Sequence, residues 1–165
     1  MRKFLYLMLC FSLCLFCSCG KVSSSSLMAH VITEIGNVPA SRLIYYSDAS
    51  PETVNYLDKE QCGKIYYDSF DINALCLDYS VMIANCDTPY EIHILRARAR
   101  SDLEEIMSAL YIRRDLIQQK NSAEYNTAGY EKTGKSAQVF SKGNYGFLLV
   151  TDDNQQAEKI IRSYL

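Results

Sequence analysis

The sequence has no strong excess of charge of either sign. Its 165 residues include 17 lysines and arginines against 19 aspartates and glutamates, for a formal net charge of −2 and an isoelectric point near 5.7. Proteins that bind duplex nucleic acids present a basic surface, so this balance argues against a nucleic-acid partner. Tryptophan is absent, glycine (7) and proline (3) are scarce, and 48% of the residues are hydrophobic. Collagen-like and wholly disordered chains are thereby excluded, and one compact domain with a short leader fits the length.

The apolar stretch at the N-terminus is too short to span a membrane. It covers 13 residues, 4–16, whereas a membrane-spanning helix needs roughly 20. Two basic residues precede it, and Cys17-Ser18-Cys19 follows, which resembles a bacterial lipoprotein signal with a small residue before the lipidated cysteine. We predict a signal peptide at 1–18, lipidation of Cys19 and a polar tether at 19–26. Ordinary secretion with cleavage at a small-residue site, or an uncleaved anchor, is the alternative.

Lipidation would place the protein on the outer face of the cytoplasmic membrane, because two acyl chains anchor a protein stably. The membrane is then the first expected partner, reached through Cys19. Of the seven cysteines, four fall in the leader or carry the lipid, and Cys62, Cys76 and Cys86 remain. Their number is odd, and their spacing is unlike that of paired zinc ligands. One disulfide and three free thiols are both compatible with the sequence.

Hydrophobic periodicity predicts several helices. Apolar residues at spacing four indicate a helix over 27–35 that ends at Gly36. A proline suited to the first helical position indicates another over 51–62. Residues 101–104 read as a capping box for a helix that reaches about residue 120, and a last helix covers 153–164.

Alternation with period two predicts the strands. Residues 75–83 and 90–94 alternate around a turn, and 139–151 form a hairpin around Gly143-Asn144. The apolar residues 43–46 fit either a short strand or a packed loop, and a polar linker covers 121–136. We predict an α+β fold with a single domain at 27–165. It contains an antiparallel sheet of about four strands, in two hairpins, covered on one face by helices.

A phosphate-binding motif occurs in the predicted linker. Residues 129–136, GYEKTGKS, match the pattern G-x-x-x-x-G-K-S/T at every fixed position. The motif binds phosphate when a buried strand precedes it and a helix follows, so that backbone amides face the ligand. Here a polar stretch precedes it and the strand-like residues 137–141 follow. We therefore predict that the match from Gly129 to Ser136 is accidental and that the protein binds no nucleotide and no other cofactor.

Three arginines alternate beyond the second predicted strand. In an extended chain Arg96, Arg98 and Arg100 share one face. Guanidinium groups recognise carboxylates and phosphates through paired hydrogen bonds, so this face is our candidate binding site for an anionic ligand or an envelope protein. The alternative is that the arginines end the strand in solvent and pair with the nearby acidic residues at 102, 104 and 105.

The histidines, His30 and His93, give weak signals for catalysis or metal binding. His93 lies on the polar parity of its strand beside Glu91, and no metal ligands converge by spacing. No nucleophile motif flanks any serine or cysteine, so we assign no catalytic residue and no metal ligand. An envelope hydrolase acting on peptide or peptidoglycan is the alternative function. It would require a cleft in which His93 or Cys76 meets a polar partner.

Four features between about residue 71 and 164 form a recognisable set: the strand Tyr90–Ala97, Arg113 or Arg114 with Gln118 or Gln119, Lys142-Gly143-Asn144-Tyr145 with the strand to Asp152, and the closing helix. With them, this region resembles an uncharacterised lipoprotein family of mostly anaerobic Gram-positive bacteria, a domain of unknown function. These motifs are structural, so the resemblance implies no catalytic residue. Together with the leader, they lead us to expect a lipid-anchored extracytoplasmic protein that acts in binding or envelope association and is not an enzyme.

Overall fold

The computed structural model describes residues 22–84, 88–120 and 128–165. Its elements, in chain order, are α2 (Ser24–Ile35), β1 (Arg42–Tyr46), α3 (Lys59–Ile65), α4 (Ile72–Leu75), β2 (Cys76–Ala84), β3 (Glu91–Ala97), the 3-10 helix η1 (Arg100–Asp102), α5 (Leu103–Gln119), α6 (Ala128–Lys135), β4 (Gln138–Lys142), β5 (Tyr145–Val150) and α7 (Asn154–Tyr164). The predicted signal peptide, Cys19 and Cys86 lie outside these ranges. Within them, no helix has the length and apolar character needed to cross a membrane.

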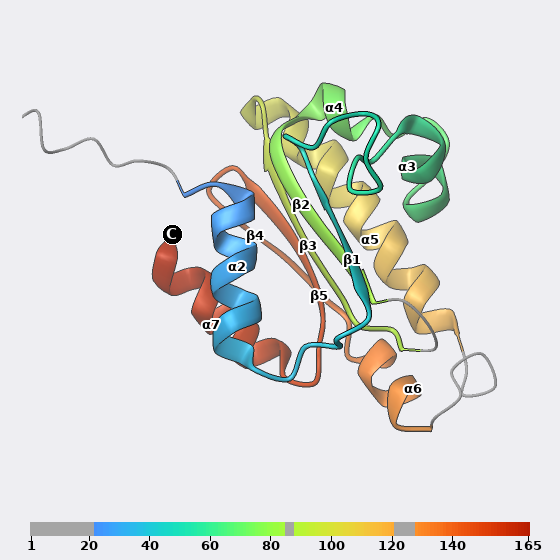
Figure 1. The fold of residues 1–165 in the computed structure, drawn as a ribbon, viewed down its shortest axis with the longest axis vertical. Coiled ribbons are helices and arrows are strands. Elements are labelled where there is room, and N and C mark those ends of the chain that lie inside the picture. Colours follow the sequence, from blue (N-terminus) through green and yellow to red (C-terminus); the bar gives the residue numbers. More distant parts are fainter. Residues whose placement is uncertain (1–21, 85–87, 121–127) are drawn as a thin grey trace, which may run out of the picture.

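The strands form one antiparallel sheet in the order β1-β2-β3-β5-β4 (Figure 1). The predicted hairpins are β2–β3 and β4–β5, and they join through the pairing of β3 with β5. The predicted α+β class is therefore confirmed. The sheet has five strands rather than about four, because the apolar residues at 43–46 pair with β2 as the edge strand β1.

Helices cover both faces of the sheet, which corrects the expectation of one covered face. α2 and α7 pack together on one face, and α5 packs on the other (Figure 1). All six residues of β5 are buried, and such a continuous apolar run is typical of a strand enclosed on both sides. The alternation in 75–83 did not indicate a second covered face. Every second residue of this stretch belongs to the face expected to be exposed, yet polar residues on that face such as Ser80 are buried.

The segment that follows β1 differs from the predicted helix over 51–62. Residues 50–55 form turns, and α3 begins only at Lys59, where the Asp58 side chain accepts a hydrogen bond from the Gln61 backbone N–H at 2.8 Å. Asn55 explains the difference. Its side-chain amide donates to the Ile44 carbonyl at 2.6 Å, and its own carbonyl accepts from the Tyr46 N–H at 3.1 Å. The loop therefore covers the outer edge of β1, which a helix at this position could not do.

The fold begins before the predicted domain boundary at residue 27. The Ser23 hydroxyl accepts a hydrogen bond from the Ser26 N–H at 3.1 Å and caps α2, so residues 24–26 form the first helical turn. Residues 23–26, expected to belong to the polar tether at 19–26, are thus folded. Serine favours the cap position because its hydroxyl satisfies an unpaired N–H of the first turn.

The long helix α5 starts in a different way from the predicted capping box. Its entry is the 3-10 turn η1, and Asp102, not Ser101, makes the cap by accepting from the Ala99 N–H at 2.8 Å. The capping-box pattern correctly predicted where the helix begins, but the residues that it assigned to the capping hydrogen bonds were wrong.

The phosphate-loop match lies on α6 and not on a loop. Residues 129–135 are helical, Ser136 follows, and the next element is strand β4. α6 is also preceded in the chain by the helix α5 and contacts it. The strand–loop–helix order in which this motif exposes its backbone amides to phosphate is therefore absent from residues 128–142.

β5 and α5 approach each other closely at Gly146. A Cβ atom built there would lie 2.9 Å from Leu110 Cδ1, 3.0 Å from Ile106 Cγ2 and 3.1 Å from Met107 Sδ. These distances are shorter than ordinary van der Waals contacts between carbon atoms. The absence of a side chain at residue 146 therefore lets α5 pack directly on the centre of the sheet.

We predict that Gly146→Val lowers the free energy of unfolding by about 1–3 kcal/mol, because it overpacks this contact. Urea unfolding measures the change. Leu110→Ala also destabilises the protein, by leaving a cavity at the same place. The double variant should lose less than the sum of the two single variants, and strict additivity would show that α5 does not rest on Gly146.

Candidate functional site

A polar network lies inside the core, between the sheet and α5. It joins Tyr66 at the end of α3, Glu91 and His93 on β3, and Arg113 on α5. His93 has 0% of its surface exposed, and Glu91 has 4%. Alternation placed both residues on a polar face of the strand. That face is instead covered by α5 and by the chain from Leu57 to Ile72.

The contacts form one continuous chain of hydrogen bonds. The Tyr66 hydroxyl lies 2.8 Å from His93 Nδ1, and His93 Nε2 lies 3.0 Å from Glu91 Oε2. Arg113 donates to both carboxylate oxygens of Glu91, from Nε at 3.0 Å and from Nη2 at 2.5 Å. Its Nη1 also donates to the Ile65 carbonyl at 3.4 Å. Two parallel hydrogen bonds are the strongest arrangement between a guanidinium and a carboxylate.

The network keeps Glu91 charged and His93 neutral. Burial alone would raise the pKa of Glu91, but the hydrogen bond from His93 and the charge and hydrogen bonds of Arg113 lower that pKa from 4.5 to about 2. Burial lowers the pKa of His93 and outweighs the opposing effect of Glu91. Since a carboxylate only accepts hydrogen bonds, Nε2 of the neutral ring carries the proton, and Nδ1 accepts from the Tyr66 hydroxyl.

These side chains are acid–base groups, but a substrate cannot reach them in this structure. His93 has no exposed surface, and Tyr66 and Glu91 are buried as well. Arg113 is the member that extends toward solvent, with 16% of its side chain exposed. General acid–base catalysis needs a group within hydrogen-bond reach of the substrate. The arrangement therefore satisfies charges inside the core and does not present them to a cleft.

The described cysteines are poor candidates for a nucleophile. Cys62 and Cys76 are free and buried, so of the two states that the sequence allowed they are thiols. Burial raises the pKa of Cys62 to about 11 and also raises the pKa of Cys76. The thiolate is the reactive form of cysteine, and these shifts suppress it at neutral pH. Across the described ranges, no three histidine, cysteine or acidic side chains are placed to hold a metal ion.

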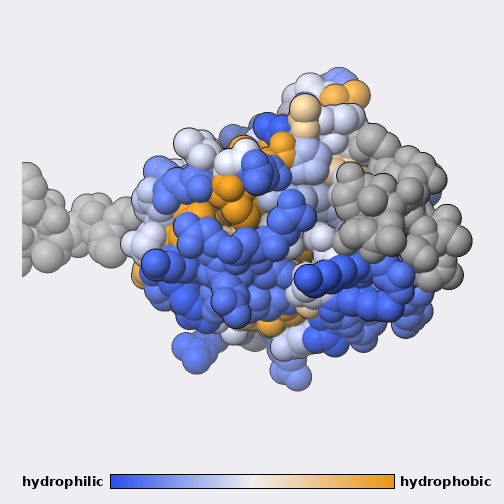
Figure 2. All heavy atoms as spheres, turned by 90° about the horizontal axis from the view of Figure 1, so that it is seen from below, coloured by the Kyte–Doolittle hydropathy of each residue, from blue (hydrophilic) through white to orange (hydrophobic). Residues whose placement is uncertain are grey.

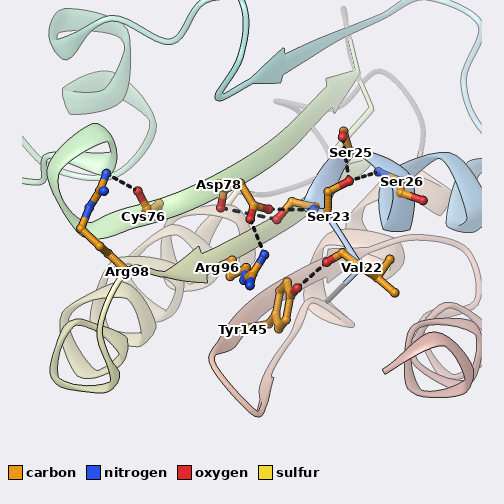
Figure 3. A network of polar contacts seen from close by, with 10 residues as sticks. Val22, Ser23, Ser25, Ser26, Cys76, Asp78, Arg96, Arg98 and Tyr145 are labelled. Carbon is orange, nitrogen blue, oxygen red and sulfur yellow. Dashed lines mark hydrogen bonds and ion pairs between the residues drawn. The ribbon is translucent and has the colours of Figure 1, made fainter. Parts of the chain in front are cut away.

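The three arginines of the candidate binding site point to different partners. β3 ends at Ala97, so the alternation stops before Arg98. Arg96 Nη1 donates to Asp78 Oδ2 on β2 at 3.0 Å, whereas Arg98 donates to the Cys76 carbonyl at 3.0 Å (Figure 3). Arg98 also donates to the carbonyls of Asn73 and Ala74 in α4, each at 3.2 Å. Arg100 is exposed at the start of η1. Arg96 and Arg98 thus make contacts within the fold, although Arg98, like Arg100, is exposed.

A second polar network fixes the start of α2 to the sheet (Figure 3). The Ser24 N–H donates to Asp78 Oδ1 at 2.7 Å, and the other oxygen of Asp78 accepts from Arg96. The Tyr145 hydroxyl donates to the Val22 carbonyl, and the Arg96 guanidinium lies 5.5 Å from the centre of the Tyr145 ring. Strands β2, β3 and β5 each contribute one side chain, so the chain is held in place from residue 22 onward.

Comparison with known proteins adds no relative: no protein-family model, curated protein or solved structure matches this chain. The resemblance to the lipoprotein family therefore stays a prediction, and the interpretation of function depends on the geometry described above.

Sequence reasoning missed Tyr66 and the role of Arg113. One signal was available, because Glu91 and His93 interrupt a strand whose other residues from 90 to 95 are apolar or aromatic. An acidic residue in such a strand needs a cationic partner if the strand is enclosed. The partner lies 22 residues away on a helix, and only the packing of α5 on the sheet brings the two together.

We predict that the protein loses stability on acidification and that His93 contributes the first part of this loss. Its folded-state pKa is lowered from 6.5, so the unfolded chain binds the proton more readily and stability falls as the pH drops below about 6.5. A group of this kind contributes a slope of up to about 1.4 kcal/mol per pH unit. Glu91, with its pKa lowered from 4.5 to about 2, adds a second loss below about pH 4.5.

Urea unfolding between pH 7.5 and 3.5 checks this assignment. His93→Gln should be less stable at pH 7 but show a flatter pH dependence between 7 and 5. His30→Gln is the matched control, because it removes a half-exposed histidine of α2 that lies outside the network. Equal flattening in both variants would contradict the role of His93.

Proposed function

We propose that the protein is a lipid-anchored extracytoplasmic module that acts in binding or envelope association and not in catalysis. The observation that carries the proposal is the way in which the fold begins. Val22 and Ser24 are held by Tyr145 and Asp78, and Val22 lies only three residues after Cys19. A lipid on Cys19 would therefore hold a folded domain directly at the membrane surface.

The buried chemistry supports a non-enzymatic role. His93 and both described cysteines are enclosed in the core, and their pKa shifts favour unreactive forms, a neutral imidazole and protonated thiols. Enzymes place such groups in a cleft with an open position for substrate. The polar surface near Arg100 is a better candidate for contact with an anionic ligand or an envelope protein.

An envelope hydrolase is the second candidate, because Tyr66, His93 and Glu91 have the order of hydrogen bonds that orients an imidazole in many acid–base sites. The two functions differ in what His93→Gln would do. We predict that the purified wild-type protein releases no soluble fragments from peptidoglycan and that His93→Gln changes stability alone. Release of fragments by the wild type and its loss in a folded His93→Gln variant would favour the hydrolase.

Lipidation is tested by the fate of the N-terminus in a bacterial host that processes lipoproteins. We predict that mass spectrometry finds an N-terminal, acylated Cys19 and that the protein fractionates with membranes. Cys19→Ala should abolish both the acyl mass and cleavage before residue 19. Cys17→Ala is the matched control and should leave both unchanged, since it alters a cysteine of the leader two residues away. A Cys19→Ala variant that is processed like the wild type would refute the anchor.

A further inference from the structure

We propose that the end of the domain at which α2 begins is a bilayer-contact surface, with Leu77 seated among lipid headgroups and Arg100 and Lys142 beside their phosphates. This inference rests on the lipidation of Cys19 in the proposed function. It adds the face of the domain that meets the membrane.

The residues concerned lie at one end of the sheet. Cys76 at the start of β2 is paired with Ala97 at the end of β3, and the Ala97 N–H donates to the Asn144 carbonyl in the β4–β5 turn at 2.8 Å. Tyr145 follows this turn and holds the Val22 carbonyl. Figure 3 shows Val22, Ser23, Arg96, Asp78 and Tyr145 gathered there. The chain therefore enters the domain at the end where β2 and β5 begin and β3 and β4 finish.

The length of chain before Val22 leaves little freedom of orientation. An extended chain advances at most about 3.6 Å per residue, so the three steps from Cys19 to Val22 span at most about 11 Å. The headgroup layer on each side of a bilayer is about 5–8 Å thick. A lipid inserted through Cys19 thus brings the surface around Val22 to the headgroups, and the opposite end of the sheet must face away.

Leu77 is an exposed apolar residue of β2 at this end, and Val54, in the loop that follows β1, is also exposed. Its exposed fraction is 48%, although it lies on β2 between Cys76 and Asp78. The pairing of β2 with β3 shifts register between these two neighbours, so Leu77 has no partner residue on β3. β1 pairs only as far as Ser80, so β2 extends beyond its outer neighbour at this position. Leu77 is therefore displaced outward by the irregular pairing next to the point where α2 is fixed.

Cationic side chains lie on the same end. Arg100 is exposed in η1, three residues after the end of β3. Lys142, just before the β4–β5 turn, is half-buried, and its Nζ donates one hydrogen bond to the Arg162 carbonyl at 2.9 Å. Lysine and arginine next to a bilayer are attracted to anionic lipids. Asp102 and Glu104 also lie near the start of α5, but Asp102 accepts a hydrogen bond from the Ala99 N–H. Because charge is mixed here, Leu77 and the lipid itself determine the contact, and the cations favour anionic membranes.

The opposite end of the domain has a surface suited to water. Seen from that end, the described residues form a mostly hydrophilic surface with small, separate hydrophobic patches (Figure 2). α6 lies there, at the far end of α5 (Figure 1). This surface would be the one that remains available to soluble partners.

The absence of tryptophan from the chain permits a direct test with single-tryptophan reporters. The full chain is produced in a lipidating host and placed in vesicles of phosphatidylglycerol and phosphatidylcholine, part of the latter brominated. We expect the Leu77→Trp reporter to be quenched at least about twofold more than a Leu116→Trp reporter, since bromine in the outer acyl region quenches only groups seated at the interface. Leu116 is similarly exposed, at 43%, but lies on α5 more than three turns from its start.

A Ser26→Trp reporter on the exposed side of the first turn of α2 serves as a second probe if Leu77→Trp disturbs folding, and it should also be quenched more than Leu116→Trp. Replacing phosphatidylglycerol by phosphatidylcholine should weaken the quenching of Leu77→Trp. Arg100→Glu should weaken it as well, whereas Lys132→Glu on α6 should not.

Two outcomes separate this inference from the proposed function. If the lipidated protein floats with the vesicles but quenching at Leu116→Trp equals or exceeds that at Leu77→Trp, the contact surface alone is overturned. Protein without an acyl group on Cys19 that fails to float overturns the proposed function as well.

Discussion

An ionised carboxylate enclosed between a sheet and a helix costs several kcal/mol unless a cation meets it there with good geometry. In this protein Glu91 occupies such a position on β3, and Arg113 supplies the cation through two hydrogen bonds. The same guanidinium reaches the Ile65 carbonyl at the end of α3. One side chain thus ties β3, α5 and α3 together, and it fixes the rotation at which α5 presents Ile106 and Leu110 to the sheet.

The two polar networks lie on different parts of the sheet and differ in strength. Glu91 and His93 are enclosed, so loss of one partner would leave a charge or polar group without water. The pair of Asp78 and Arg96 keeps 20% and 13% of its side chains exposed, and such partly solvated pairs contribute about 1 kcal/mol or less. Removal of one member of the first network is therefore more destabilising than removal of one member of the second. The second orients the N-terminal helix by combining several weak contacts, none of which holds α2 alone.

The sequence predicted most of the elements because their signals are local. The alternation in 75–83, the Gly143-Asn144 turn and the apolar stripe of α5 each describe a segment that forms the same structure wherever it packs. Coverage of the second face of the sheet could not be read in this way, since it depends on where α2 and α7 return to the sheet. The turn at residues 50–55 was missed for a similar reason. Asn55 is recruited by the free edge of β1, a partner that is not adjacent in the chain.

The candidate sites also differ in whether local sequence or tertiary packing determines them. The spacing of Arg96, Arg98 and Arg100 describes one face only while the chain stays extended, and the end of β3 at Ala97 removes that condition. Each cationic side chain near the end of the strand then forms hydrogen bonds with the nearest acceptors. For Arg96 the acceptor is Asp78, and for Arg98 the acceptors include the Cys76 carbonyl. The pairing of Glu91 with Arg113 could be anticipated as a need for some cation, but its identity required the packing of α5.

The buried network also explains why β3 has a single register. A slip by one residue would turn Glu91 and His93 toward the opposite face of the sheet, because side chains alternate with a period of two. That face is lined by apolar residues of α2 and α7 such as Leu27, Met28 and Ile161, and an ionised carboxylate placed against them would lose Arg113. An apolar core at these positions could be equally stable, as replacements of buried ion pairs in other proteins indicate. We infer that the network specifies the register of the central strand, because only one register places Glu91 beside Arg113.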